Sequence, residues 1–414
     1  MLKNITRSLS LSLLVFNSAF ASIPLNSPGF NAQFTTDMLE KYGAEFTSLE
    51  HQNMGDLVFL HLPGSMAGEK LKLSLPNGLK LSYGEIVMFA GDMFGDPSKP
   101  ISNCAAKDRM ACFKAQFTAM ALQGKAADKR CSNPLNQAKT IQEFMATIAK
   151  QIESSREQGI SASEYYRKND VDISKQMNEL TCGGSFISSY IPFGTYIKLA
   201  QVNFDHFVPD SLLAYKVGHR YAMETALEGY KKEQAGLHEE AMQLLELAYA
   251  QNAYANHYLS DSFSAGHMRT PRRAIDQEIY LPAVLNLLIA NLMHNEDNKN
   301  GLNVVNAEGT SWIAYGDGYL DNPEAQAQKV IMLDAMQRSA DGIYLTFQNG
   351  EIPETYPEMR LLPDYAAIPQ LNNSAPLFKY EDGVLLKRSN NSDPNDHHWS
   401  SYWSGIITLI RFSS

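Results

Sequence analysis

The side chains best suited to chemistry lie in the segment from Asn256 to His267. His257 and Asp261 are four residues apart, so on a helix both side chains project from one face and can hold a cation together. His267 follows six residues after Asp261 and would point away from that face on an uninterrupted helix. We therefore predict that the helix ends or bends near Ser264 to Gly266, where small residues and a glycine make a break inexpensive.

Other histidines and carboxylates of similar character lie upstream and downstream of this segment. Asp92 follows a helix-like run and meets a turn rich in glycine and proline, and His206 closes one helix just before the next begins. Downstream, His294 and Asp297 are three residues apart at a helix end and can share an ion. Each residue alone has a simpler interpretation as a turn residue, a helix cap or a buried histidine. As a set they favour a metal centre, and the candidate ligands are Asp92, His206, His257, Asp261, His267, His294 and Asp297.

The order and spacing of these segments resemble those of the bacterial zinc-dependent phospholipases C, which share a fold with the single-strand-specific S1/P1 nucleases. The resemblance rests on Gly91-Asp92, the HFVPD element (206–210), the HxxxD pair (257–261) and then His267, and it spans about half of the chain. The phrase DSFSAGHMRTPR around His267 also resembles a lineage of exported phospholipases C.

The resemblance implies a centre of two or three zinc ions. The first ion would be held by Asp92, His206, His257 and Asp261. The second would be held by His267 and His294, with a carboxylate from Asp297 or Glu296. Asp261 would also reach a third ion, which this family completes with the mature N-terminal residue and a histidine; His51 and His61 are the candidates here.

This chain departs from the family pattern in two places. The family has a glutamate four residues after the histidine that corresponds to His294, whereas this chain has Asn298. The mature N-terminus would be Ser22 rather than a tryptophan.

The activity implied by the resemblance is phospholipase C, which would hydrolyse a glycerophospholipid such as phosphatidylcholine to diacylglycerol and a phosphorylated headgroup. Clustered zinc ions suit this reaction because they bind phosphoryl oxygens and lower the pKa of a bound water. The resemblance also implies that Asp92 is the general base. The expected partners are the phospholipid substrate and, transiently, a membrane surface, with no nucleic acid, and the protein is expected to act as a monomer.

Two alternatives stay open at this point. The first is an S1/P1-like zinc nuclease or another phosphodiesterase, and the second is a non-catalytic exported protein that binds zinc or lipid. Three arginines after His267, at positions 269, 272 and 273, would either steer an anionic headgroup or membrane surface, or simply lie in solvent.

Composition narrows the classes of function. The 414-residue chain has a formal net charge of -10 and is 44% hydrophobic. A chain this acidic is a poor general binder of nucleic-acid backbone. The sequence also has no GxSxG, P-loop or GxGxxG motif, so it gives no support to serine-hydrolase or nucleotide-binding functions.

The first residues predict export. Lys3 and Arg7 precede an apolar stretch from Leu9 to Phe20 and an Ala-Phe-Ala site, which together are typical of a signal peptide over residues 1–21. We expect a secreted or periplasmic protein without a transmembrane anchor. The even number of cysteines favours two disulfides, and Cys104 with Cys112 is the predicted short-loop pair.

The hydrophobic pattern predicts elements that position these residues. A β-hairpin is expected over 70–82 and a loop or hairpin over 301–319, with a short helical segment near 37–42. Longer helices are expected over 138–158, 191–204, 210–232, 237–262, 276–294 and 323–347. The predicted fold class is mainly α, a helical bundle of the zinc phospholipase C/P1 nuclease type with small β-hairpins. The catalytic domain would span 22–348, followed by an irregular or β-containing extension over 349–414 that is rich in proline.

Overall fold

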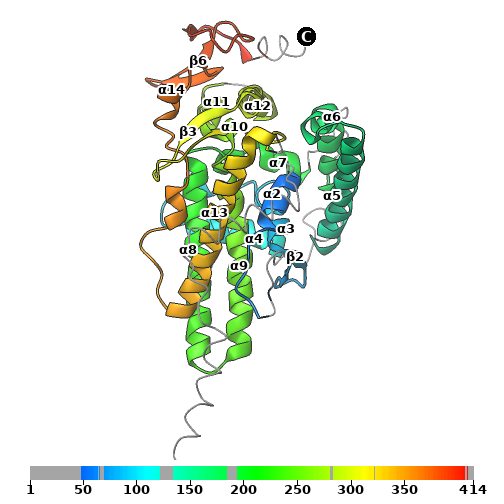
Figure 1. Ribbon diagram of the computed structural model, residues 1–414, viewed down its shortest axis with the longest axis vertical. Coiled ribbons are helices and arrows are strands. Elements are labelled where there is room, and N and C mark those ends of the chain that lie inside the picture. Colours follow the sequence, from blue (N-terminus) through cyan, green and yellow to red (C-terminus); the bar gives the residue numbers. More distant parts are fainter. Residues whose placement is uncertain are drawn as a thin grey trace, which may run out of the picture.

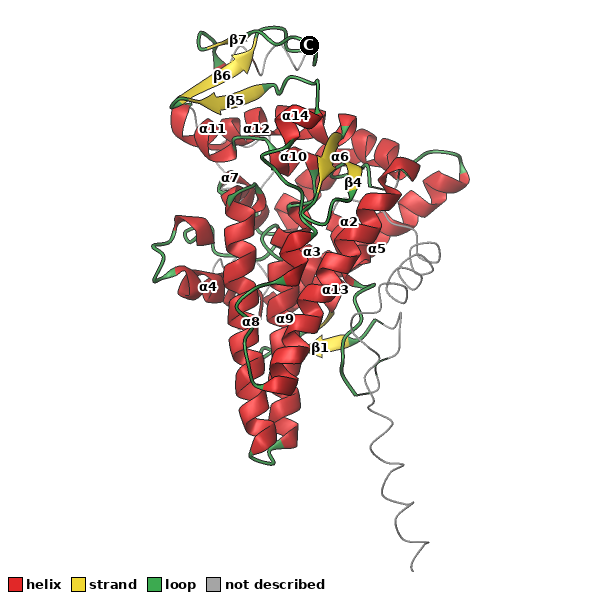
Figure 2. Ribbon diagram, turned by 60° about the vertical axis from the view of Figure 1, so that its left-hand side comes forward, coloured by secondary structure: helices red, strands yellow, loops and turns green. Residues whose placement is uncertain are grey.

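The computed structural model describes residues 48–63, 65, 70–121, 134–183, 194–279, 283–320, 322–405 and 408. Most of these residues are helical, and the strands form only small antiparallel sheets, so the predicted mainly α class is confirmed (Figures 1 and 2). The predicted signal peptide, the helix near 37–42 and the expected mature N-terminus lie outside the described residues.

Long helices form the centre of the molecule (Figure 1). They are α8 (Asp210–Gln234), α9 (His238–Asp261) and α13 (Gln326–Asn349). Small residues let α8 approach its neighbours closely, since a Cβ added to Gly218 would lie 2.7 Å from the Cβ of Ala255. Every residue of α9 from Ala248 to Asp261 is buried, so its polar side chains need partners inside the protein.

Shorter helices surround this centre. One group packs beside α8 and α9 and consists of α2 (Ser48–Gly55), α3 (Tyr83–Phe89) and α4 (Arg109–Ala121). A pair at one side of the molecule consists of α5 (Pro134–Glu157) and α6 (Ala162–Leu180) (Figure 1). The end of the bundle at which α9 stops carries α7 (Thr195–Gln201), α10 (Ala265–Met268), α11 (Arg272–Glu278) and α12 (Ala283–Asn300) (Figure 1).

Both predicted hairpins are present. The first pairs β1 (Lys72–Ser74) with β2 (Lys80–Ser82), and the second pairs β3 (Leu302–Val305) with β4 (Ser311–Ala314). The C-terminal extension contains a three-stranded antiparallel sheet of β5 (Phe378–Glu381), β6 (Val384–Arg388) and β7 (Trp399–Ser400). Of the two forms predicted for the extension, irregular or β-containing, the structure shows the second.

The extension packs on the bundle in two places. Its first part, with η4 (Pro357–Arg360) and α14 (Ile368–Leu371), contributes buried leucines and an isoleucine to the main core. Its sheet builds a second, smaller core with α11 and α12, in which Phe378 and Leu385 pack near Ile275, Ile289 and Met293. Trp403 packs against this second core, as expected for most of the aromatic residues near the C-terminus.

Several helix predictions need correction. The single helix expected over 276–294 is two helices, α11 and α12, because the backbone becomes extended at Ile279, with φ of -104° and ψ of 110°. The helix expected over 191–204 is the shorter α7 followed by the 3-10 turn η2 (Asn203–His206). Helices α4 and α6 were not predicted, although α6 is amphipathic and begins after the N-cap residue Ser161.

The predicted disulfide between Cys104 and Cys112 is present. Cys182 is also disulfide-bonded, and Cys131 lies outside the described residues. In the described part of the chain, none of the helices combines the length and apolar character that a bilayer-spanning segment needs.

A glycine pair brings α2 against α3. A Cβ on Gly84 would lie 2.0 Å from the carbonyl oxygen of Gln52, and a Cβ on Gly55 would lie 2.6 Å from the Cα of Gly84. Replacing Gly84 by alanine should force α2 away and lower the free energy of unfolding by about 1–3 kcal/mol or more. Gly342→Ala is the matched control, because its Cβ would meet the flexible end of Met223 at 3.1 Å and the ring of His219 at an ordinary contact distance of 3.5 Å. Chemical denaturation should show a loss for the first variant alone, and equal losses would contradict the close packing.

Candidate metal centre

Asp261, the last residue of α9, lies among four imidazoles from four elements. Its Oδ2 is 2.9 Å from Nδ1 of His206 and 3.3 Å from Nε2 of His257. Its Oδ1 is 3.4 Å from Nε2 of His51 and 3.5 Å from Nδ1 of His267. The side chain is only 1% exposed, so this carboxylate depends on its neighbours for compensation.

The first group of possible ligands consists of Asp92, His206 and His257. Nε2 of His257 is 3.0 Å from Nδ1 of His206, and each of these nitrogens is 3.8 Å from an oxygen of Asp92. Nδ1 of His257 lies 2.9 Å from the carbonyl oxygen of Val87 and donates to it in the neutral tautomer that turns Nε2 toward the group. The structure thus brings together residues predicted from three separate segments.

The second group consists of His267, His294 and Asp317. Nε2 of His294 is 3.1 Å from Nε2 of His267 and 2.9 Å from Oδ2 of Asp317. Asp317 follows β4 and was not among the predicted ligands.

The carboxylates predicted for this second group point elsewhere. Both oxygens of Asp297 accept hydrogen bonds from Arg269, each at 2.7 Å. Both oxygens of Glu296 accept from Arg388, at 2.9 and 2.6 Å. The structure therefore does not place Asp297, which was predicted as a ligand, among the residues of the second group, because Arg269 holds its carboxylate.

Asn298 supports the second group instead of joining it. Its Oδ1 accepts hydrogen bonds from the backbone N–H of Gly266 at 2.6 Å and from Oγ of Ser264 at 3.1 Å. A Cβ on Gly266 would lie 2.5 Å from this oxygen, so only glycine fits there. The contact holds the turn that carries His267 into the site.

A third group consists of His51, His257 and Asp261. His51 lies on α2, and its Nδ1 is 2.9 Å from Oγ of Ser260. The other predicted candidate, His61, lies outside these groups, where its Nε2 is 3.1 Å from Asp341. Ser22, the expected N-terminal ligand, lies outside the described residues.

The predicted break in the long helix is confirmed. Helix α9 ends at Asp261, and α10 starts at Ala265 after a short turn. The backbone N–H of Val208 donates to the carbonyl oxygen of His267 at 3.0 Å, which joins this turn to the segment that carries His206.

The turn that carries Asp92 is fixed from both sides. Gly91 has a φ of 74°, and a Cβ there would lie 2.9 Å from Nε2 of His206. The hydroxyl of Tyr254 donates to the carbonyl oxygen of Phe94 at 2.6 Å and accepts from the N–H of Gly91 at 3.2 Å. Tyr254 lies one turn before the ligand pair on α9, so one helix positions both parts of the first group.

Burial and charge set the protonation of these groups. Burial lowers the pKa of His257 to about 4, against the opposite effect of Asp261 and Asp92. Burial alone would also lower the pKa of His206, but the carboxylates of Asp261 and Asp92 raise it to about 9. Burial would raise the pKa of Asp261, yet the surrounding imidazoles hold it well below its usual range. The centre therefore has an ionised carboxylate and, at His257, an imidazole with a free lone pair.

The donor set fits zinc. Ring nitrogens that face each other at 3.0 and 3.1 Å repel unless a proton or a cation lies between them. Ligand atoms around tetrahedral zinc, with bonds of about 2.0–2.1 Å, are separated by roughly 3.3–3.5 Å. Within the described residues, Nδ1 of His267 and Oδ1 of Asp317 are buried without a hydrogen-bond partner, as expected of atoms in a metal-binding cluster.

The three arginines after His267 are engaged within the protein. Arg269 pairs with Asp297, and Arg273 pairs with Asp210 at 2.7 Å. Arg272 is buried and donates to the carbonyl oxygen of Gln201 near the end of α7 at 2.8 Å. These contacts support a structural role for the three arginines. They do not support a role in steering an anionic headgroup.

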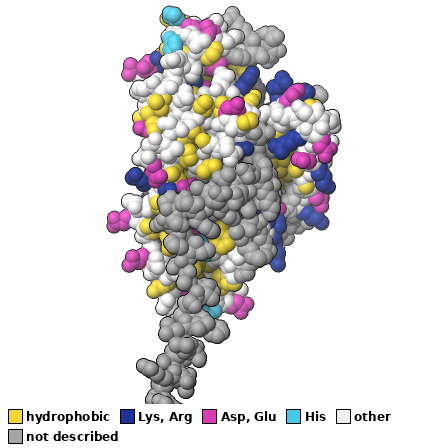
Figure 3. All heavy atoms as spheres, viewed as in Figure 1, with side chains coloured by type: hydrophobic (Ala, Val, Ile, Leu, Met, Phe, Trp, Pro, Cys, Tyr) yellow, Lys and Arg dark blue, Asp and Glu magenta, His cyan; other side chains and the backbone are white. Residues whose placement is uncertain are grey.

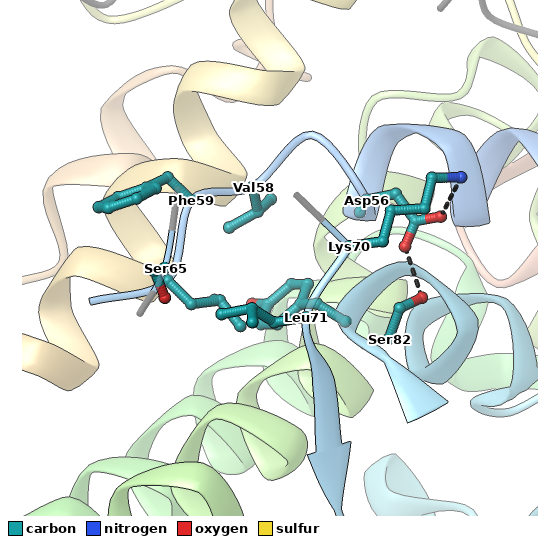
Figure 4. A pocket seen from close by; sticks show the side chains of 10 residues that line it. Asp56, Val58, Phe59, Ser65, Lys70, Leu71 and Ser82 are labelled. Carbon is teal, nitrogen blue, oxygen red and sulfur yellow. Dashed lines mark hydrogen bonds and ion pairs between the residues drawn. The ribbon is translucent and has the colours of Figure 1, made fainter. Parts of the chain in front are cut away.

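Of two pockets in the described part of the chain, one adjoins the possible metal ligands and the other does not. One, drawn in Figure 4, lies between α2 and the first hairpin, where Asp56 contacts Lys70 and Ser82, and it includes none of the possible ligands. The other is lined by Gly91, His206 and further residues, and it adjoins the first group.

Comparison with known proteins found no matching family model, no similar curated protein and no similar solved structure.

Removing the Tyr254 hydroxyl tests how the Asp92 turn is held. In Tyr254→Phe, the Gly91 N–H and the Phe94 carbonyl each lose their hydroxyl partner but keep their 3.2 Å hydrogen bond to each other, so the free energy of unfolding should fall by about 0.5–1.5 kcal/mol. Zinc affinity should fall as well, measured by competition with a chelator. Tyr249→Phe is the matched control, since its hydroxyl on the same helix accepts only from the His61 N–H and should change stability without changing zinc affinity. Equal zinc affinity in both variants would contradict this role.

Metal binding should release protons. Because the pKa of His206 is about 9, its ring is mostly protonated at pH 8 and must lose a proton before that nitrogen binds a cation. We expect zinc binding at pH 8 to release about one proton or more per chain. Calorimetry in two buffers of different ionisation enthalpy measures this number, and an enthalpy that does not depend on the buffer would refute the assignment.

Proposed function

We propose that this protein is a zinc-dependent phosphodiesterase with phospholipase C activity, which cleaves a glycerophospholipid such as phosphatidylcholine to diacylglycerol and a phosphorylated headgroup. The observation that supports it best is the carboxylate of Asp261, which belongs to one group that could hold a cation and contacts a histidine of each of the other two groups. Clustered divalent ions of this kind are suited to binding and cleaving a phosphodiester. Membership of the phospholipase C/P1 nuclease fold is part of this proposal.

Some residues of the centre are expected to bind the ions, and Asp92 is also expected to contact the substrate. Zinc, when bound, would neutralise charge on the phosphoryl group and lower the pKa of a bound water. Asp92 has a third of its side chain exposed, whereas His206 and His257 are buried, so Asp92 faces the side from which water and substrate arrive. This placement supports the role of general base for Asp92.

Two observations favour phospholipid over nucleic acid as the substrate. The phrase around His267 resembles phospholipases C, and the net charge of -10 disfavours a polyanion. On the face shown in Figure 3, the basic side chains at the right-hand edge are interspersed with acidic ones. The disulfide between Cys104 and Cys112 is consistent with export, and we retain the expectation of a monomer that contacts membrane transiently.

The test is an assay of purified protein on phosphatidylcholine and on single-stranded DNA, with and without a chelator. We expect zinc-dependent release of phosphocholine, and Asp261→Asn should lower it by about 1,000-fold or more, because the third group loses a ligand and the histidines of the first two groups lose the carboxylate that they contact. His61→Gln is the control variant, since this histidine pairs with Asp341 away from the groups, and it should keep full activity.

The outcomes separate the alternatives. Cleavage of DNA alone would replace the phospholipase proposal by the nuclease. Bound zinc without turnover of either substrate would favour a non-catalytic zinc-binding protein, and the absence of zinc uptake would overturn all three.

A further inference from the structure

The C-terminal segment, residues 372–400, contacts all three stretches of chain that carry the second group. These stretches contain His267, His294 and Asp317, which lie in α10, in α12 and three residues after β4. In both ribbon views the sheet of this segment lies over α11 and α12 (Figures 1 and 2).

The contact with α12 is an ion pair at a buried arginine. Arg388 on β6 is fully buried and binds both carboxylate oxygens of Glu296, at 2.9 and 2.6 Å. Glu296 follows His294 by two residues on α12. Arg388 also donates to the carbonyl oxygens of Ala375 and Asn391, each at 2.6 Å, so the guanidinium joins the helix to the body of the C-terminal segment.

The contact with the turn after α9 passes through Arg269, two residues after His267. Its guanidinium binds both oxygens of Asp297 and donates to the carbonyl oxygen of Ser374 at 3.0 Å. One side chain therefore connects the His267 turn, helix α12 and the start of the C-terminal segment.

The contact with the β3–β4 hairpin is made by Asn372. Its Oδ1 accepts from the backbone N–H of Asn303 at 2.8 Å, and its Nδ2 donates to the carbonyl oxygen of the same residue at 2.9 Å. Asn303 pairs with Ile313 in the hairpin, and Asp317 follows β4 after three residues. The C-terminal segment is therefore attached to β3 of the hairpin whose other strand leads to Asp317.

We propose that the C-terminal segment is a positioning element for the second ion site, because it sets the separations among His267, His294 and Asp317. This inference rests on the proposed metal centre. Ligands that come from three stretches of chain must stay within tenths of an ångström of their bonding positions, and contacts behind the ligands typically change metal affinity by about 10–100-fold. The ligands Asp92, His206 and His257 are positioned by η2, α9 and the turn after α3, so their ion should be unaffected.

The experiment measures zinc affinity in the full-length protein by competition with a chromophoric chelator. The double variant Glu296→Met/Arg388→Met removes the pair without leaving an unpaired buried charge. We expect the zinc-binding step of the second group to weaken by about 10–100-fold while the remaining zinc binding is unchanged. In a His294→Ala background, where the second site has already lost a ligand, the same double change should have no further effect.

Two further variants complete the experiment. Lys379→Met is the matched control, because it breaks the 2.7 Å pair with Glu381 in the same sheet without touching α12, and it should bind zinc normally. Asn372→Ala, at a less buried position, provides the test if the double variant does not fold as judged by circular dichroism, and it should weaken the same step.

Retention of normal zinc affinity by folded Glu296→Met/Arg388→Met, or by Asn372→Ala, would overturn the positioning role. Uniform weakening of every zinc-binding step would overturn it too, since a general loss of stability would then explain the result. An unmodified protein that binds no zinc would instead refute the proposed function.

Discussion

The buried carboxylate of Asp261 is the constraint on which the rest of the arrangement depends. An ionised carboxylate at 1% exposure is costly unless positive charge or strong hydrogen bonds compensate it. Compensation here comes from imidazoles at 2.9 to 3.5 Å that belong to His51, His206, His257 and His267. Because these imidazoles come from different elements, the bundle can close around the carboxylate only in one relative placement of α2, η2, α9 and α10.

Helix α9 links this constraint to the core. Before His257, helix α9 contains Asn252 and Asn256. The Nδ2 atoms of both residues donate to the hydroxyl of Tyr83 at 2.8 Å. Tyr83 begins α3, and the carbonyl oxygen of Val87 on α3 lies 2.9 Å from Nδ1 of His257. The buried polar contacts of α9 therefore fix the neighbouring helix, and that helix in turn orients the ring of His257 toward the site.

The sequence predicted what local spacing determines and missed what tertiary packing decides. The pair His257 and Asp261 and the break before His267 follow from helix geometry over eleven residues. Asp297 also had suitable spacing, but its buried carboxylate is taken by Arg269, a contact that spacing cannot reveal. Asp317 lies 23 residues after His294 and across a hairpin, so helical spacing gave no signal. A glycine before the aspartate, as at Asp92, was the available sequence signal for it.

The most direct test is a crystal structure of the zinc-soaked protein with anomalous data collected above and below the zinc absorption edge. We predict anomalous peaks about 2.0–2.2 Å from Oδ2 of Asp261 and from the facing nitrogens of His206 and His257, and a further peak between His267 and His294. Crystals that show no peak at Asp261, or peaks only at exposed surface histidines, would contradict the metal centre on which the proposed hydrolysis depends.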